Sequence, residues 1–257
     1  MESRLSQSDP DATLLGRWAL VTGAGKRIGA TIAQTLHGAG ASVAIHYFTS
    51  AEPAEALAGE LNAIRPGSAL ALGADLRQTS QLAALVSSLV AHSGRLDILV
   101  NNASTFYPTP LATVTEEQWH DVVDSNLKAP LFLCRHALPH LQATRGVIIN
   151  IVDIHALRPL RHHVVYGAAK AGLAMLTRSL AKDLGPEIRV NGVAPGAILW
   201  PESGVSEKVQ QSIMREVSLR RPGEPQDVAR TVLFLVRDAP YITGQIIAVD
   251  GGRSVGW

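Results

Sequence analysis

The residues with the clearest capacity for chemistry are Tyr166 and Lys170, four positions apart in the segment VYGAAKA. The segment consists mostly of small, helix-compatible residues, and residues four apart on a helix lie on one face. An ammonium group beside a phenol favours the phenolate, which suits a proton donor that works near neutral pH. A chance pairing on a solvated helix face is the alternative, so the rest of the chain must decide between the two.

The composition limits the class of protein. The chain has 257 residues, of which 46% are hydrophobic and 18% charged, with a formal net charge of +1. These values are typical of one α/β domain and exclude a disordered chain or a general polyanion binder, so we expect no nucleic-acid partner. The single cysteine, Cys134, lies in an apolar helical pattern, excludes an intramolecular disulfide and fits a reducing compartment.

The ends and hydropathy of the chain predict its location. No apolar run reaches about 18 residues, so we expect no membrane-spanning helix. Residues 1–16 are polar and lack the apolar core of a signal peptide. We therefore expect a flexible N-terminal tail over 1–16, a folded domain over 17–257 and a cytoplasmic protein.

Short apolar segments alternate with helical patterns along the domain. The expected strands are 18–24, 42–47, 68–76, 96–103, 146–153, 188–195 and 244–252. The expected helices are 28–40, 52–64, 78–94, one starting near Thr115, 127–144, the Tyr166/Lys170 helix and 225–238. The alternation predicts a single-domain α/β fold, a Rossmann-like doubly wound parallel sheet of about seven strands with helices on both faces.

The first two strand ends predict a dinucleotide site, because ligands of such sheets bind at the carboxyl ends of the strands. The turn TGAGKRIG, at 22–29, brings backbone and a helix N-terminus to a phosphate. HYFTS, at 46–50, lacks the acidic residue that commonly binds the ribose hydroxyls of NAD. The groups that could bind a 2′-phosphate instead are Lys26, Arg27, His46, Thr49 and Ser50. The sequence therefore predicts NADPH as the cofactor. The alternative for His46 and Tyr47 is that they are ordinary strand-end residues.

The remaining strand ends extend the predicted site. The asparagines of NNAS, at 101–104, can tie neighbouring strand ends together by side-chain hydrogen bonds. Phe106 and Tyr107 can stack on a flat ligand or form a small cluster that anchors their loop. The predicted cofactor contacts are Gly23, Lys26, Arg27, Ile28, Gly29, His46, Tyr47, Ser50, Asp75, Leu76, Asn102, Ala103, Ser104, Tyr166, Lys170, Pro195, Gly196 and Ile198.

Taken in order, TGAGKRIG, NNA, Asn126, Asp153, the YxxxK motif and a Pro-Gly pair resemble the short-chain dehydrogenase/reductase family over residues 18–252. The resemblance implies hydride transfer with a nicotinamide and, usually, a homotetramer. It also implies that Tyr166 donates a proton and that Lys170 lowers the pKa of Tyr166 and contacts the nicotinamide ribose. Asn126 would hold a water in a proton relay behind Lys170.

Two departures from the general family pattern narrow the substrate. Arg27 stands where the turn usually has glycine, and Asp153 replaces the usual serine that polarises a substrate carbonyl. A carboxylate there repels a developing oxyanion, so it suits a ring that presents N–H donors or needs a proton on nitrogen. Together with NNAS.FYPTPL, at 101–111, these residues are similar to the pteridine reductase branch and to bacterial dihydromonapterin reductases.

The branch resemblance implies specific substrate contacts. A pterin would lie between the nicotinamide and Phe106, with Arg27 and Ser104 helping to hold it and the cofactor phosphates. Asp153 would pair with the amino-pyrimidine edge or assist protonation. The predicted catalytic residues are Asp153, Tyr166, Lys170 and Asn126, and the predicted substrate contacts are Arg27, Ser104, Phe106, Asp153, Tyr166 and Trp200.

The sequence therefore predicts NADPH-dependent reduction of a pteridine, either a dihydropterin or dihydrofolate. Two alternatives are a carbonyl reductase acting on 3-oxoacyl thioesters and a catalytically silent NADP-binding sensor. No metal is expected, because His155, His162 and His163 lack a zinc-like ligand set. Residues 197–222 are the expected substrate flap, in which Trp200 lines the pocket or anchors the flap; the C-terminal GRSVGW caps the site or lies in a subunit interface.

Overall fold

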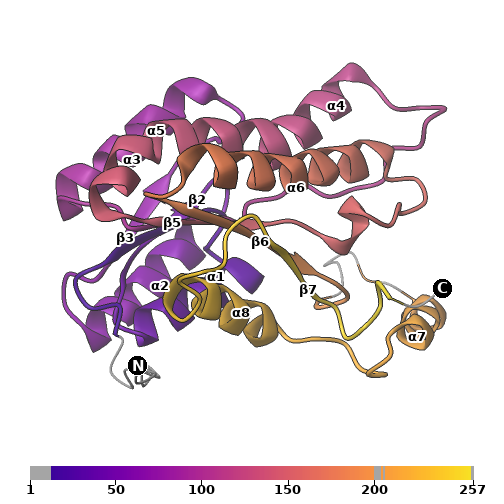
Figure 1. The fold of residues 1–257 in the computed structure, drawn as a ribbon. Coiled ribbons are helices and arrows are strands. Elements are labelled where there is room, and N and C mark those ends of the chain that lie inside the picture. Colours follow the sequence, from indigo (N-terminus) through magenta and orange to yellow (C-terminus); the bar gives the residue numbers. More distant parts are fainter. Residues whose placement is uncertain (1–12, 200–203, 205, 256–257) are drawn as a thin grey trace, which may run out of the picture.

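A computed structural model describes residues 13–199, 204 and 206–255. Its centre is a parallel sheet of seven strands in the order β3-β2-β1-β4-β5-β6-β7, as predicted (Figure 1). The strands are β1 (Trp18–Val21), β2 (Ser42–Tyr47), β3 (Ala69–Gly73), β4 (Ile98–Asn101), β5 (Val147–Ile151), β6 (Arg189–Pro195) and β7 (Ile246–Val249).

Helices cover both faces of the sheet. Helices α3 (Thr79–Ser93), α4 (Glu116–Val123), α5 (Ala129–Thr144) and α6 (Val164–Leu184) lie on one face (Figure 1). Helices α1 (Arg27–Gly38), α2 (Ala51–Ile64) and α8 (Pro225–Arg237) lie on the other. Because successive strand residues point to opposite faces, Ala19 and Val21 pack with α1 and α8, whereas Leu20 packs with α3 and α5. The prediction of a doubly wound Rossmann-like domain is confirmed.

Several strands are shorter than their apolar runs. The third run, 68–76, forms a strand only over Ala69–Gly73, and Asp75 lies in the turn that follows. The seventh, 244–252, forms a strand only over Ile246–Val249; the Asp250 side chain then accepts hydrogen bonds from the amides of Gly252 and Ser254. In both cases the chain leaves the strand before its apolar run ends, and polar groups occupy the carboxyl edge of the sheet.

Two helical features differ from the expectation. Thr115 caps α4 through a reciprocal capping box with Gln118, as its sequence pattern indicates. The helix then continues through a π-helical turn, Asp124–Lys128, directly into α5. The expected flap contains a helix that was not predicted, α7 (Glu207–Glu216), none of whose residues is buried.

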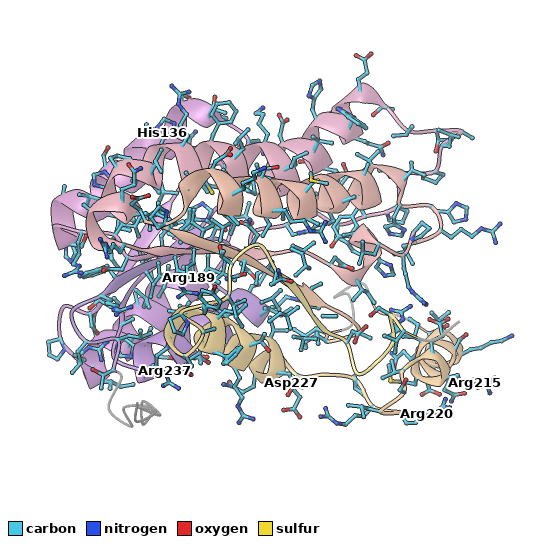
Figure 2. The ribbon with its side chains drawn as sticks, in the orientation of Figure 1. His136, Arg189, Arg215, Arg220, Asp227 and Arg237 are labelled. Atoms are coloured by element: carbon cyan, nitrogen blue, oxygen red, sulfur yellow. The ribbon has the colours of Figure 1, made fainter. Side chains whose placement is uncertain are left out.

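The side chain of Arg189 links β6 to α8. Arg189, on β6, donates hydrogen bonds to the carbonyl oxygens of Leu235 and Val236 at 2.7 and 2.9 Å, near the C-terminus of α8 (Figure 2). A cation at these carbonyls complements the helix dipole and satisfies acceptors that the helix leaves open.

Within the residues that the structure describes, no helix is long and apolar enough to cross a membrane.

Candidate active site

A cavity of about 460 Å³ opens at the carboxyl ends of β1, β2, β3 and β4. Its wall contains most of the predicted cofactor contacts, from the glycine-rich turn to Ser104. The lining residues are Gly23, Gly25, Lys26, Arg27, Ile28, Gly29, His46, Tyr47, Phe48, Thr49, Ser50, Asp75, Leu76, Arg77, Asn102, Ala103, Ser104, Thr105 and Ser125. Sequence reasoning missed Phe48 and Arg77 in particular, although Arg77 follows Asp75 by two positions.

The glycine-rich turn is packed so closely that two of its glycines have no room for a side chain. Gly23 has a φ of +61°, and a Cβ there would lie 3.0 Å from the Cα of Ala103. A Cβ on Gly29 would lie 2.4 Å from the carbonyl oxygen of Gly23 and 2.5 Å from Nδ2 of Asn102. Glycine is therefore required for this tight turn, which brings backbone and the N-terminus of α1 to the cavity wall, where a phosphate can bind.

Arg27 occupies a backbone position that favours glycine. Its φ is +57°, in the left-handed region, at the first residue of α1. A non-glycine residue in this region costs about 1 kcal/mol or more, and such strain is concentrated at functional sites. The conformation explains why glycine is usual there and leaves a guanidinium group on an exposed residue of the cavity wall.

His46 is an anchor for the turn rather than a ligand for a phosphate. Its ring is buried; Nδ1 accepts from the amide of Gly23 at 3.1 Å, and Nε2 donates to the carbonyl oxygen of Ala74 at 3.0 Å. Burial lowers the pKa of His46 to about 4, so the ring is neutral. The expectation that His46 serves a 2′-phosphate is therefore wrong, because both ring nitrogens are engaged and no charge is present.

The paired asparagines connect strand ends, as expected. Asn101 donates to Oδ1 of Asn150 at 2.8 Å, which links β4 to β5. Asn102 donates to the carbonyl oxygens of Thr22 and Gly23 at 2.8 and 3.2 Å, which links β4 to the glycine-rich turn. These bonds hold the cavity and the next strand end in a fixed relation.

The groups predicted to react lie together at the end of β5. The Tyr166 hydroxyl donates to Oδ2 of Asp153 at 2.7 Å, and Oδ1 of Asp153 accepts from the amide of His155 at 2.7 Å. Nζ of Lys170 donates to the carbonyl oxygen of Ile151 at 2.9 Å and lies 5.7 Å from the centre of the Tyr166 ring. Tyr166 and Lys170 are both buried, which excludes the chance pairing on a solvated helix face.

Burial and nearby charge shift the pKa values in this cluster. Burial raises the pKa of Tyr166 well above its usual value, the charge and hydrogen bond of Asp153 raise it further, and hydrogen bonding with Ser104 acts in the opposite direction. Burial lowers the pKa of Lys170 to about 8, while Asp153 acts to raise it. Burial and Asp153 thus favour the neutral phenol in this arrangement. A lowering of the pKa of Tyr166 by Lys170 stays a prediction.

Asn126 lies in the π-helical turn with its side chain fully buried. Its Oδ1 accepts from the Ser104 hydroxyl at 2.7 Å, and its Nδ2 donates to the carbonyl oxygens of Thr105 and Val122, both at 2.9 Å. The side chain therefore fixes the loop that follows β4. A role of Asn126 in a proton relay stays a prediction.

Phe106 stands next to Tyr166. Its ring meets that of Tyr166 edge to face, with centroids 4.8 Å apart, and stacks on that of His163 at 4.7 Å with an interplanar angle of 16°. The side chain of Phe106 is 45% exposed, whereas Tyr107 packs into the small cluster of Val122, Val165 and Tyr166. Tyr107 therefore has the anchoring role expected of one of these aromatics, and stacking of a ligand on the part-exposed Phe106 stays a prediction.

The end of β6 contributes backbone shape. A Cβ on Gly196 would lie 2.6 Å from Cβ of Asp250, and the amide of Gly196 donates to the carbonyl oxygen of Val249 at 3.0 Å. Pro195, Gly196 and Ile198 lie outside the part of the cavity wall formed by described residues. Trp200, predicted to contact substrate, lies outside the described residues. Over the described part of the chain, no three His, Cys, Asp or Glu side chains gather as metal ligands.

Known proteins resemble this chain along nearly its whole length. A family described as enoyl-(acyl carrier protein) reductase matches residues 23–254. Pteridine reductase 1 of Leishmania tarentolae is 39% identical over 278 aligned residues, covering 92% of this chain and 96% of that protein. The 3-oxoacyl-[acyl-carrier-protein] reductase FabG of Staphylococcus aureus is 37% identical over 238 residues, covering 91% and 96%.

A solved structure agrees with these matches. The crystal structure of a protein described as a short-chain alcohol dehydrogenase, from Sinorhizobium meliloti, superposes with a TM-score of 0.91 at 34% identity. It covers 96% of this chain and 100% of that one. These similarities agree with the order of the strands, the glycine-rich turn and the buried Tyr166–Lys170 pair. The chain is an oxidoreductase of the short-chain dehydrogenase/reductase family.

Proposed function

We propose that the protein reduces a pteridine with NADPH, converting a dihydropterin or dihydrofolate to its tetrahydro form. The observation that carries the proposal is the 2.7 Å hydrogen bond from the Tyr166 hydroxyl to the Asp153 carboxylate, beside the exposed face of Phe106. A flat heterocycle with amino and N–H groups needs both a stacking surface and a hydrogen-bond acceptor. The 39% identity to Pteridine reductase 1 supports the same substrate class.

The charges along the cavity support NADPH as the cofactor. The β2 end, residues 46–50, offers no carboxylate to the ribose hydroxyls, and Lys26 and Arg27 are exposed residues of the cavity wall. A 2′-phosphate is favoured by cations and disfavoured by a carboxylate. Replacing Lys26 with Ala should raise the KM for NADPH by about threefold to tenfold and that for NADH far less, since one partly exposed ion pair is worth about 1 kcal/mol.

The roles of the reacting groups follow from their contacts. When bound, NADPH supplies a hydride to a ring carbon of a C=N bond, and the ring nitrogen must then gain a proton. Tyr166 holds a proton throughout the neutral range, because burial and Asp153 keep its pKa high. For turnover, the Tyr166 hydroxyl must donate its hydrogen bond to the substrate nitrogen instead of to Asp153. The Asp153 oxygen that is then free accepts a hydrogen bond from an N–H of the ring. Lys170, with a pKa of about 8, is a proton source behind the tyrosine.

A carbonyl reductase is the second candidate, because FabG of S. aureus is 37% identical to this chain. The Asp153 carboxylate argues against it, since a negative charge destabilises the oxyanion that forms during carbonyl reduction. The two functions therefore respond oppositely to the replacement of Asp153 with Ser. A pteridine reductase should lose most of its turnover, whereas a carbonyl reductase should retain or gain activity.

The deciding assay follows NADPH oxidation with dihydrobiopterin, dihydromonapterin and dihydrofolate, beside an acetoacetyl thioester. Pteridine turnover that is lost in Asp153→Ala and Tyr166→Phe would establish the proposed function and the roles of both residues. Turnover of the thioester alone would contradict the proposal. A protein that binds NADPH and turns over none of these substrates would instead support the NADP-binding sensor.

A further inference from the structure

The part of the β5–α6 loop that follows Asp153, residues 154–163, is rich in basic side chains. It carries two arginines and three histidines, and the chain has no acidic residue between Asp153 and Asp183. The loop leads into α6, a helix of 21 residues whose first turn also lacks an acidic side chain. The positive end of the helix dipole therefore adds to the charge of the loop. The basic residues are His155, Arg158, Arg161, His162 and His163.

This basic loop is bonded to the segment that carries Phe106. The amide of Thr109 donates to the carbonyl oxygen of His162 at 2.6 Å, and the amide of Val165 donates to the Thr109 hydroxyl at 3.4 Å. Thr109 is itself buried, so the junction between the two loops is part of the folded structure. The segment that carries Phe106 and the basic loop are therefore held together.

One aromatic ring separates the loop from the reactive hydroxyl. Phe106 contacts Tyr166 at 4.8 Å on one side and His163 at 4.7 Å on the other, measured between ring centres. Nδ1 of His163 donates to the carbonyl oxygen of Arg161 at 2.8 Å, since that oxygen can only accept. This bond fixes the imidazole and keeps the backbone of Arg161 against the stack. The residues Arg161 and His162 are exposed.

We propose that the basic loop binds an anionic group, a carboxylate or a phosphate, on the side chain of the substrate. The inference deepens the proposed function and rests on it. In this proposal, a ring stacked on Phe106 and protonated by Tyr166 directs its substituent toward Arg161 and His162, in the loop that is bonded to the Phe106 segment. The loop then distinguishes tailed pteridines from those with a neutral side chain. Each exposed charge pair should contribute up to about fivefold in kcat/KM, the usual limit for solvent-exposed ion pairs.

The test compares three substrates that share the reacting ring. Dihydrofolate carries carboxylates, the phosphate ester of dihydroneopterin carries a phosphate, and dihydrobiopterin carries a neutral side chain. We expect kcat/KM for an anionic substrate to exceed that for dihydrobiopterin by about threefold to tenfold at low ionic strength. The ratio should approach one in about 0.5 M salt, because salt screens exposed charges. Whether the carboxylates or the phosphate give the larger ratio identifies the tail.

The variants Arg161→Gln and His162→Gln, alone and combined, should lower that ratio toward one. Arg178→Gln is the matched control: it removes the same charge from an exposed position on α6, about 20 Å along the helix from its first residue. A wild-type ratio near one, or an equal fall of the ratio in the control, would overturn the inference while the proposed function stands. Turnover of none of the three pteridines would overturn both.

Discussion

The two ends of the binding edge use their residues in different ways. On the side of β1, β2 and β3, backbone shapes the cavity. Glycines occupy positions where a side chain would not fit, and both ring nitrogens of His46 are hydrogen-bonded to backbone groups. On the side of β5 and α6, functional side chains gather: Tyr166 is bonded to Asp153, and Lys170 is bonded to the carbonyl oxygen of Ile151. One half is specified by shape and the other by functional groups.

The difference has a physical reason. A dinucleotide presents phosphates that backbone amides and a helix terminus can bind, so this half tolerates many side chains provided that none fills the space. Proton transfer needs a particular atom at a particular place with a controlled pKa, so the other half should tolerate almost no substitutions of its functional side chains. Single substitutions should therefore affect binding and stability on the first side, and turnover on the second.

The largest effect should follow Tyr166→Phe, which removes only the hydroxyl. We expect kcat to fall by about 10²- to 10⁴-fold, the usual contribution of a positioned proton donor, while NADPH affinity changes far less. Tyr241→Phe is the matched control, because Tyr241 is fully exposed at 101%. Steady-state NADPH oxidation and cofactor titration separate the two effects. An equal loss of kcat and of NADPH affinity would contradict the division between the two sides.

Gly29→Ala tests the opposite side. The added methyl would lie 2.4 Å from a backbone oxygen, so the turn must shift; we expect a loss of about 1–3 kcal/mol in the free energy of unfolding and weaker NADPH binding. Gly38→Ala, in the same helix with nothing within 4 Å of the new Cβ, is the control. It should be neutral or slightly stabilising. Urea unfolding of both variants measures the contrast, and equal stabilities would refute the steric argument.

The lowered pKa of His46, on the cofactor side, predicts that the stability of the protein depends on pH. Its pKa is about 4 in the folded protein against 6.5 for a free histidine, so the unfolded chain binds more protons between these values. The contribution to stability is complete above pH 6.5 and is lost as the pH falls towards 4, by up to about 3 kcal/mol. Unfolding free energies measured across this window should show the slope in the wild-type protein.

The control for this slope is a second histidine. His46→Gln should flatten the dependence and lower stability throughout, because the ring bridges Gly23 and Ala74. His136→Gln, on α5 and outside the described cavity wall, should leave the slope unchanged (Figure 2). A wild-type slope that persists in His46→Gln would assign it to other groups.

Much of the fold and site follows from local sequence patterns. Apolar runs such as that of β2 predict buried strands, and the helix carrying Tyr166 and Lys170 follows from their spacing. What sequence could not supply depends on tertiary contacts. The neutral state of His46 follows from its burial at the sheet edge, and the raised pKa of Tyr166 from burial beside Asp153. The stack of His163 on Phe106 joins residues more than 50 positions apart.

Arg77, on the cofactor side, should show the smallest effect. Its guanidinium pairs with Asp75 at 2.9 Å and with Asp121 of α4 at 2.8 Å, and it lies 5.0 Å from the ring centre of Phe48. Because the side chain is 39% exposed, Arg77→Gln should cost only about 1 kcal/mol of stability. It should also raise the KM for NADPH about twofold to fivefold, since Arg77 lines the cavity and holds Asp75.

Arg95→Gln is the control that separates the loss of stability from the rise in the KM for NADPH. Arg95 pairs with Asp97 at 2.6 Å and is 45% exposed, but it lies outside the described wall of the cavity. Its replacement should therefore reduce the free energy of unfolding by a similar amount and leave the KM for NADPH unchanged. If both variants raise that KM equally, Arg77 acts through general stability. A change confined to Arg77→Gln means that an exposed ion pair orders the cofactor wall, and that even the side specified by shape depends on one charged group.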